Sequence, residues 1–379
     1  MEELSGEIRY RMLETVRQFA HKKLQASGEQ EPVQARHLKF HVELAETFEV
    51  EFTGPRQVAW LHKLESDVDN VRAAIAWSMT VRDVHAGLRL AAALREFWLL
   101  RHIGEGIEHV RAVLALKESA GTPAERARAL ACAGYLLTFQ GNPAQAWTAL
   151  AEARTLALEA GDAVTSARCL IWLGEAAHRA GDYDTALRCA SEGLAQLRAV
   201  DDQYQVGCAL YDLGDMALRR NNYAQAQAFY AESAIVLRPR GEQLNVAISL
   251  RRLGQVSLER GDWRKAAASV LESLSLNVKG ADKRGIAACV AALASIGAAR
   301  GHAAEAVRIC GAVSAILEAM QTHMLTYDQG QYERTLEIGR AELNAAVFDS
   351  VWTDGRRMTI EQAVQAARSA ANLLLSADG

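Results

Sequence analysis

Residues 161–200 read GDAVTSARCLIWLGEAAHRAGDYDTALRCASEGLAQLRAV, and this stretch is one period of a pattern that returns every 40 residues. One series of turn signals comprises Gly141, Gly181, Asn221, Gly261 and Gly301. A second series, offset by 20 residues, comprises Gly121, Gly161, Asp201, Gly241 and Ala281. Two interleaved series predict a repeated helix-turn-helix unit, because glycine tolerates the left-handed conformation that ends a helix and a following Asp, Asn or Thr can cap the next helix.

The spacing also predicts how long the helices are and where two of them start. With 20 residues per half-repeat and about three in the turn, each helix should have roughly 16 to 17 residues and a length of about 25 Å. The string from Thr122 to Glu125 has capping-box spacing with Pro123 at the first helical position, and the string from Asn142 to Gln145 resembles it. Both strings predict helix starts.

Two columns of small residues recur inside the repeat, twelve positions apart. They are Gly134, Gly174, Gly214, Gly254 and Ala294, and then Ala146, Ala186, Ala226, Ala266 and Ala306. Small residues that face each other across a hairpin let two helices approach closely. The columns resemble the tetratricopeptide repeat (TPR), and the resemblance implies an all-α, right-handed superhelical solenoid of TPR-like hairpins. The period of 40 exceeds the usual period of about 34, which leaves HEAT-like packing as the weaker alternative.

Further helices are expected on both sides of the regular repeats. The expected segments are Val33–Val50, Arg56–Met79, Leu88–Leu100, Glu105–Leu116, Tyr327–Val351 and Thr359–Leu375, with Asp354-Gly355 separating the last two. The register fails after Met320, so the last two helices are expected to cap the open stack.

Several strings outside the columns carry a second resemblance. Residues 6–20 read GEIRYRMLETVRQFA, 54–65 GPRQVAWLHKLE, 69–77 DNVRAAIAW and 354–364 DGRRMTIEQAV. In this order they resemble the region of bacterial STAND-class NTPase regulators, including LuxR-type and antibiotic-regulator-like members, where a winged-helix segment passes into a helical sensor. The resemblance implies four parts: the end of a winged-helix-like segment and linker in 1–30, N-terminal capping helices in 31–84, the repeat solenoid in 85–320, and C-terminal capping helices in 321–379.

The modules that flank this region in the family are not found in the sequence. No GxxxxGK[ST] phosphate loop occurs in the chain, which ends about where a DNA-binding helix-turn-helix would begin. We therefore expect neither ATP binding nor DNA binding from this chain. It is either a fragment of a longer protein or a stand-alone relative, and an NTPase module could act with it in cis or in trans.

Net charge bears on possible partners, and cysteine usage bears on the cellular compartment. The 42 Lys+Arg and 46 Asp+Glu give a formal charge of -4 without a basic block, which argues against direct nucleic-acid binding. Six cysteines form no CxxC pair, as expected for buried thiols in a reducing cytosol. The N-terminus lacks a signal peptide and no apolar run is long enough to span a bilayer. We predict a cytoplasmic protein without a membrane partner.

Catalytic and metal-binding patterns are also not found. No HExxH or GxSxG occurs, and His37 and His41 share a helix face without a third ligand at metal spacing. We predict no enzymatic activity, no metal site and no cofactor.

The candidate binding residues lie at positions that face the groove in the TPR pattern. They are Arg95, Trp98, Arg128, Tyr135, Arg168, Glu175, His178, Tyr211, Asp215 and Arg251. Arginines beside aromatic rings suit a carboxylate, phosphate or sugar, and Arg128, Arg168 and Arg251 could converge on one anionic group. The alternative is a solvated inner face on which the arginines pair with Glu175, Asp215 and Glu259.

Tryptophan burial is a further prediction. We expect Trp98 to be partly exposed, and five other tryptophans to lie in the core: Trp60, Trp77, Trp147, Trp172 and Trp263.

Two functions fit these expectations. The first is a regulatory or sensor solenoid of a bacterial signalling or transcriptional regulator, with a protein segment, a peptide or a small effector in its groove. The alternative is a stand-alone TPR adaptor that scaffolds protein partners.

Overall fold

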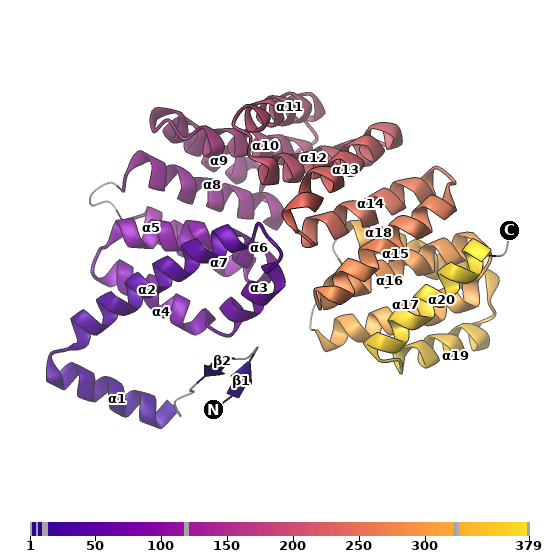
Figure 1. The fold of residues 1–379 in the computed structure, drawn as a ribbon, viewed down its shortest axis with the longest axis horizontal. Coiled ribbons are helices and arrows are strands. Elements are labelled where there is room, and N and C mark those ends of the chain that lie inside the picture. Colours follow the sequence, from indigo (N-terminus) through magenta and orange to yellow (C-terminus); the bar gives the residue numbers. More distant parts are fainter. Residues whose placement is uncertain are drawn as a thin grey trace. The chain divides into compact units, whose positions relative to one another are not determined.

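The computed structural model describes residues 2–4, 7–9, 14–116, 121–320, 324 and 326–376. Apart from a short antiparallel hairpin formed by β1 (Glu2–Leu4) and β2 (Glu7–Arg9), its regular structure is helical (Figure 1). The helices pack as adjacent hairpins. The predicted all-α fold of TPR-like hairpins is therefore confirmed.

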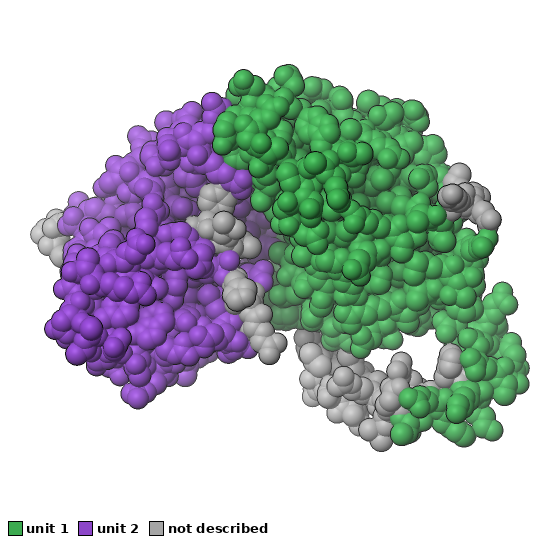
Figure 2. All heavy atoms as spheres, turned by 180° about the vertical axis from the view of Figure 1, so that it is seen from behind, with its two compact units in different colours: residues 1–202 green, residues 203–379 purple. Residues whose placement is uncertain are grey.

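The chain packs as two units, residues 1–202 and 203–379 (Figure 2). The helices of unit 1 are α1 (Glu14–Ser27), α2 (Gln30–Glu51), α3 (Gln57–Glu65), α4 (Val68–Thr80), α5 (Val84–Ala93), α6 (Arg95–Arg101), α7 (Ile103–Leu114), α8 (Pro123–Gln140), α9 (Pro143–Glu159), α10 (Ala163–Arg179) and α11 (Tyr183–Ala199). Unit 2 contains α12 (Gln203–Arg219), α13 (Tyr223–Leu237), the 3-10 turn η1 (Arg238–Arg240), α14 (Leu244–Glu259), α15 (Trp263–Lys279), α16 (Lys283–Ala299), α17 (Ala303–Ala319), α18 (Thr326–Glu342), α19 (Ala345–Arg356) and α20 (Ile360–Ser376). The four-part division expected from the sequence stays a prediction.

The turn series is the part of the sequence pattern that the backbone follows most closely. Nine of the ten turn positions have positive φ, between 52° at Ala281 and 94° at Gly141, and Gly121 is the exception. Asp162, Asp182 and Asp262 each accept a hydrogen bond from a backbone N–H of the first turn of the following helix. These local interactions end one helix and start the next, which confirms the repeated hairpin.

The two predicted helix starts are both present, but they are capped differently. The complete capping box of Thr122 and Glu125 starts α8. In contrast, the side chain of Asn142 does not cap α9 and donates to Gln140 Oε1 over 3.0 Å. The resemblance between the two strings therefore holds for the Pro at the first helical position and not for the cap.

The columns of small residues lie where the two helices of a hairpin cross. A Cβ atom added to Gly174 on α10 would lie 2.9 Å from the carbonyl oxygen of Ala186 and 3.1 Å from Cβ of Ala190, both on α11. The partner column, Ala146 to Ala306, is at most 2% exposed. Close approach of the helices is thus the reason for small residues at these positions.

Several expected helices divide where the sequence shows no glycine. The segment expected over Arg56–Met79 is two helices, α3 and α4, and Leu88–Leu100 divides into α5 and α6 at Leu94. The segment over Tyr327–Val351 divides at Asn344, whose side chain accepts from the N–H of Val347 and caps α19.

The expected break at Asp354-Gly355 was wrong, because both residues lie inside α19. A Cβ at Gly355 would overlap the backbone of Arg308 on α17. The glycine therefore permits close packing of α17 and α19 and does not form a turn.

Within the described part of the chain, no helix combines the length and apolar composition that a membrane crossing requires.

Candidate functional site

Six side chains on the first helices of the unit 1 hairpins form what we call the arginine-aromatic strip. It comprises Arg95 on α6, Tyr135 and Phe139 on α8, and Arg168, Trp172 and Arg179 on α10. Residues four apart share a helix face, which places Tyr135 beside Phe139 and Arg168 beside Trp172. The strip thus joins neighbouring hairpins of one unit.

Trp172 lies at the centre of the strip. The guanidinium carbons of Arg168 and Arg95 lie 4.8 Å and 5.1 Å from the centre of its ring, and the ring of Tyr135 lies 4.6 Å away. At the far end, the guanidinium carbon of Arg179 lies 5.0 Å from the Phe139 ring. Guanidinium groups at these distances interact favourably with the aromatic faces, which holds the arginine side chains in place.

Most arginines in and beside the strip already have a carboxylate partner. Arg95 Nη2 lies 3.0 Å from Glu96 Oε1, and Arg179 Nε lies 2.7 Å from Glu175 Oε1. Arg128 on α8 pairs with Glu49 on α2. Of the pairings expected as the alternative, the one with Glu175 is present at Arg179, whereas the partner of Arg128, Glu49, was not expected from the sequence.

Arg168 is different from these arginines. It has no hydrogen bond or ion pair with any described residue, and its Nε atom is buried without a partner. The rest of the side chain is half-buried against Trp172. Arg168 therefore presents a positive charge with unused hydrogen-bond donors, which suits an external carboxylate or phosphate.

Four candidate residues of unit 1 are less accessible than the sequence suggests, since Arg95, Trp98, Glu175 and His178 are all buried. Trp98 is fully buried, so the prediction of partial exposure was wrong. Its ring packs against Phe97, His102 and His109, and Gly106 on α7 leaves room for it. His178 is 4% exposed and packs against Tyr183 at the start of α11.

From the sequence, Trp172, the central ring of the strip, is expected in the core and not among the candidate binding residues. Trp172 is indeed buried, at 6% exposure, and the other core tryptophans are half-buried except Trp147, which is 38% exposed and was predicted wrongly. The signal for the strip is the spacing of four between Arg168 and Trp172, which puts both on one face of α10.

In unit 2 the candidate residues form a buried ionic cluster under α18. Asp328 on α18 pairs with Arg251 and lies 3.2 Å from Nη1 of Arg252. Arg252 Nε lies 3.5 Å from Asp215 Oδ1, and the hydroxyl of Tyr230 donates to the same carboxylate. Burial, reinforced by Asp215, raises the pKa of Tyr211 beside this cluster.

This cluster corrects the expectation that three arginines converge on one external anion. Arg251 is 5% exposed and engaged by Asp328, and Arg128 is engaged by Glu49. Asp328, the partner of Arg251, lies 77 residues further along the chain, outside the repeat register, and this pairing was not expected from the sequence. Of the three, only Arg168 has no carboxylate partner among the described residues.

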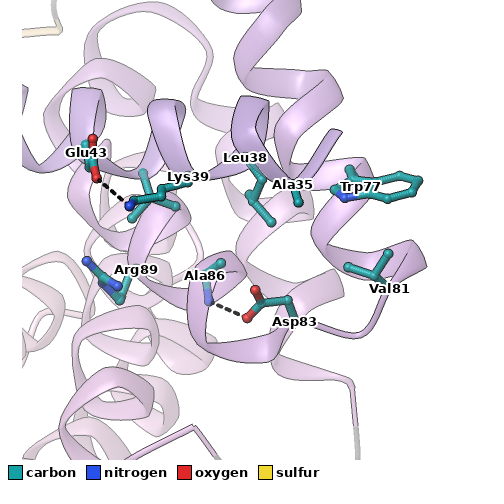
Figure 3. A pocket seen from close by; sticks show the side chains of 10 residues that line it. Ala35, Leu38, Lys39, Glu43, Trp77, Val81, Asp83, Ala86 and Arg89 are labelled. Atoms are coloured by element: carbon teal, nitrogen blue, oxygen red, sulfur yellow. Dashed lines mark hydrogen bonds and ion pairs between the residues drawn. The ribbon is translucent and has the colours of Figure 1, made fainter. Parts of the chain in front are cut away.

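A cavity of about 460 Å³ between α2, α4 and α5 was not expected from the sequence (Figure 3). Its walls include the apolar side chains of Leu38, Val42, Trp77 and Val81. The charged groups at its edge are engaged: Asp83 accepts from Ala86 N over 3.0 Å, and Lys39 lies 3.9 Å from Glu43. It therefore offers a ligand mainly apolar contact.

The histidine pair on α2 is not arranged as a metal site. His41 Nε2 lies 3.1 Å from Asp67 Oδ2, while its Nδ1 lies 2.8 Å from the carbonyl of His37. Burial lowers the pKa of His37, and the neighbouring His41 lowers it further. Among the described residues, no group of three His, Cys, Asp or Glu side chains is placed to hold a metal ion.

Comparison with known proteins agrees with the repeat. The tetratricopeptide repeat family matches residues 205–277. Proteins of Mycobacterium tuberculosis and Mycobacterium bovis that carry the provisional name of HTH-type transcriptional regulator are 32% identical over 218 residues. That match covers 55% of this chain and 24% of each relative.

Solved structures share the fold at low sequence identity. A Rap protein in complex with Competence and Sporulation Factor superposes with a TM-score of 0.54 at 12% identity, covering 86% of this chain and 99% of the other. A Signal Transduction ATPase with Numerous Domains (STAND) protein with a tetratricopeptide repeat sensor, from Pyrococcus horikoshii, has a TM-score of 0.52 at 14% identity, covering 86% and 55%.

Proposed function

We propose that this chain is a non-enzymatic regulatory module whose arginine-aromatic strip binds an acidic segment of a partner protein. The observation that carries the proposal is the state of Arg168, a half-buried arginine that lies against Trp172 and has no partner among the described residues. A TPR-like fold supports a role in protein interaction, since repeat stacks of this kind use an extended surface for binding.

The chemistry of the strip favours a carboxylate as the group that is bound. A charge-assisted hydrogen bond between the half-buried guanidinium of Arg168 and an external carboxylate is worth about 1.5–3 kcal/mol. The guanidinium carbon of Arg95 lies within about 10 Å of that of Arg168, because both lie near the Trp172 ring. The pairing of Arg95 with Glu96 leaves Arg168 as the primary anchor.

The accessible edges of the strip favour a protein segment over a small anion. Phe139 is 37% exposed and lies beside Arg179, whose guanidinium is only partly shielded by Glu175. An extended segment that places an Asp or Glu on Arg168 can lay an apolar or aromatic side chain on Phe139. A small anionic effector would use Arg168 alone.

The regulatory context rests on the relatives. A match to proteins named as transcriptional regulators and the likeness to a TPR-containing STAND protein support a module that works with an NTPase in cis or in trans. The alternative is a stand-alone TPR adaptor. A phosphate-loop NTPase encoded in the same or an adjacent reading frame would favour the regulator over the adaptor.

A display library of random peptides, selected on the immobilised chain and then measured by fluorescence anisotropy, tests the proposal. We expect the selected peptides to be enriched in Asp and Glu, and Arg168→Ala to weaken their binding by about 1.5–3 kcal/mol, or roughly 10- to 150-fold. The matched control is Arg188→Ala on α11, where Arg188 is exposed and donates to Thr185 Oγ1. Equal loss in both variants, or selected peptides without acidic residues, would contradict the assignment.

A further inference from the structure

The first helices of unit 2 already carry a helix of the same chain. Helix α18 packs on α16 and α17, and polar contacts tie it to both α14 and α16. Asp328 pairs with Arg251 and Arg252, Arg334 Nη2 lies 2.8 Å from Glu259 Oε1, and Thr335 Oγ1 lies 2.8 Å from Ser295 Oγ. The positions that TPR geometry assigns to ligand contact, Arg251 and Glu259, are thus occupied from within unit 2.

Helix α18 has two buried stripes of different chemistry. Asp328, Gln331 and Thr335 form a polar stripe at a spacing of three and four residues, and all three are buried. The second stripe faces α17 and α19: the hydroxyl of Tyr332 donates to the Cys310 carbonyl, and Gly339 lies against Val307 and Phe348. The polar stripe thus supplies the contacts of Asp328 with α14 and of Thr335 with α16, while Leu336 of α18 lies in the apolar core of unit 2.

A polar seam of this kind is poorly suited to a purely structural role. Buried ion pairs add little stability compared with apolar side chains of similar size, whereas removal of one partner is strongly destabilising because it leaves a buried charge uncompensated. Arg251 and Arg252 are 5% and 1% exposed, so both require an anion for as long as they are covered. Another carboxylate on a helix can satisfy them as Asp328 does.

We propose that Arg251, Arg252, Glu259 and Ser295 form a docking surface for an acidic helix, with α18 as its built-in occupant. The external partner is a helical protein segment with a carboxylate at the position of Asp328 and Arg-Thr six and seven residues later, and it binds by displacing α18. Charge complementarity and the seated α18 identify this occupant. The inference is independent of the function proposed for unit 1.

The test uses the full chain and a fluorescent peptide of residues 324–342 as the partner helix. The tethered α18 competes with the peptide at an effective concentration that can reach the millimolar range. We therefore expect weak binding to the wild-type chain and at least tenfold tighter binding to the Asp328→Ala chain, whose own helix has lost its carboxylate. A peptide that itself carries Asp328→Ala should bind the Asp328→Ala chain at least tenfold more weakly than the unmodified peptide.

A cysteine lock shows whether the peptide uses this surface. Ser295→Cys with Thr335→Cys should form a disulfide between α16 and α18, since the two hydroxyl oxygens are in contact. In the chain that combines the lock with Asp328→Ala, oxidation should abolish peptide binding and reduction should restore it.

Two results would overturn the proposal: a folded Asp328→Ala chain that binds the peptide no more tightly than wild type, or a lock without effect. If Asp328→Ala unfolds by circular dichroism, the same titration and the same criterion apply to Thr335→Ala, which loosens the seam without leaving a charge unpaired.

Discussion

The substitution Gly174→Leu tests the packing of the hairpin most directly. An added Cβ would lie 2.9 Å from the carbonyl oxygen of Ala186 and 3.1 Å from the backbone nitrogen of Ala190, and backbone atoms cannot rotate out of the way. Overpacking typically costs about 1–3 kcal/mol, and the need to move the backbone of α11 puts this site at the upper end. The better helix propensity of Leu returns about 0.8 kcal/mol. We expect a net destabilisation of about 2 kcal/mol.

Thermal melts followed by circular dichroism measure this effect. For a unit of 202 residues, a loss of about 2 kcal/mol corresponds to a fall in Tm of about 4–8 °C. The control is Gly297→Ala on α16, where an added Cβ has no atom within 4 Å and removal of a helical glycine should raise stability by about 0.5–1 kcal/mol. If the Gly174→Leu variant has the same Tm as wild type, the two helices do not cross closely at this glycine, and the argument from the columns of small residues fails.

Three further predictions concern the caps, the thiols and an acidic side chain. Thr122→Ala should destabilise the protein by about 1 kcal/mol because Thr122 caps α8. Asn142→Ala should change the free energy of unfolding by only a few tenths of that amount, because the Asn142 side chain makes no cap hydrogen bond. Urea denaturation of the two variants measures the difference, and equal effects would contradict the prediction. A thiol reagent added to the native protein should modify Cys208 first, because Cys208 is half-buried while the other five cysteines are buried. Burial also raises the pKa of Cys132 and Cys169 to about 12, which disfavours the reactive thiolate. Mass spectrometry of the labelled peptides identifies the modified residue, and early labelling of Cys132 would contradict its burial. Hydrogen bonds from Arg72 lower the pKa of Glu105 to about 2, below its ordinary 4.5, so this carboxylate contributes stability above about pH 4.5 that is lost as the pH falls toward 2. The Arg72→Gln variant should therefore be less stable than wild type at pH 7, and the difference should shrink as the pH falls from 4.5 to 2. A difference in the free energy of unfolding that is constant with pH would refute the pairing.

The local features of the fold could be predicted from the sequence alone. Turn positions such as Gly141 and Gly181 depend on the φ angle of one residue and on a cap a few residues away, so a period of 40 residues reveals them. The small columns are visible for the same reason, since Gly174 and Ala186 meet across a single short turn. These interactions act over short distances along the chain, and the residue types that satisfy them are few.

The state of each candidate binding residue depended instead on contacts between distant segments. Trp98 is buried because α7 folds back over α6. Arg251 forms an ion pair with Asp328, which lies 77 residues further along the chain. Arg168 matches Arg128 in the repeat, yet Glu49 neutralises only Arg128. The sequence by itself predicted a set of residues that could face a ligand. Only tertiary structure decided which of them keeps an unpaired charge, because a carboxylate from outside the repeat register is what removes it.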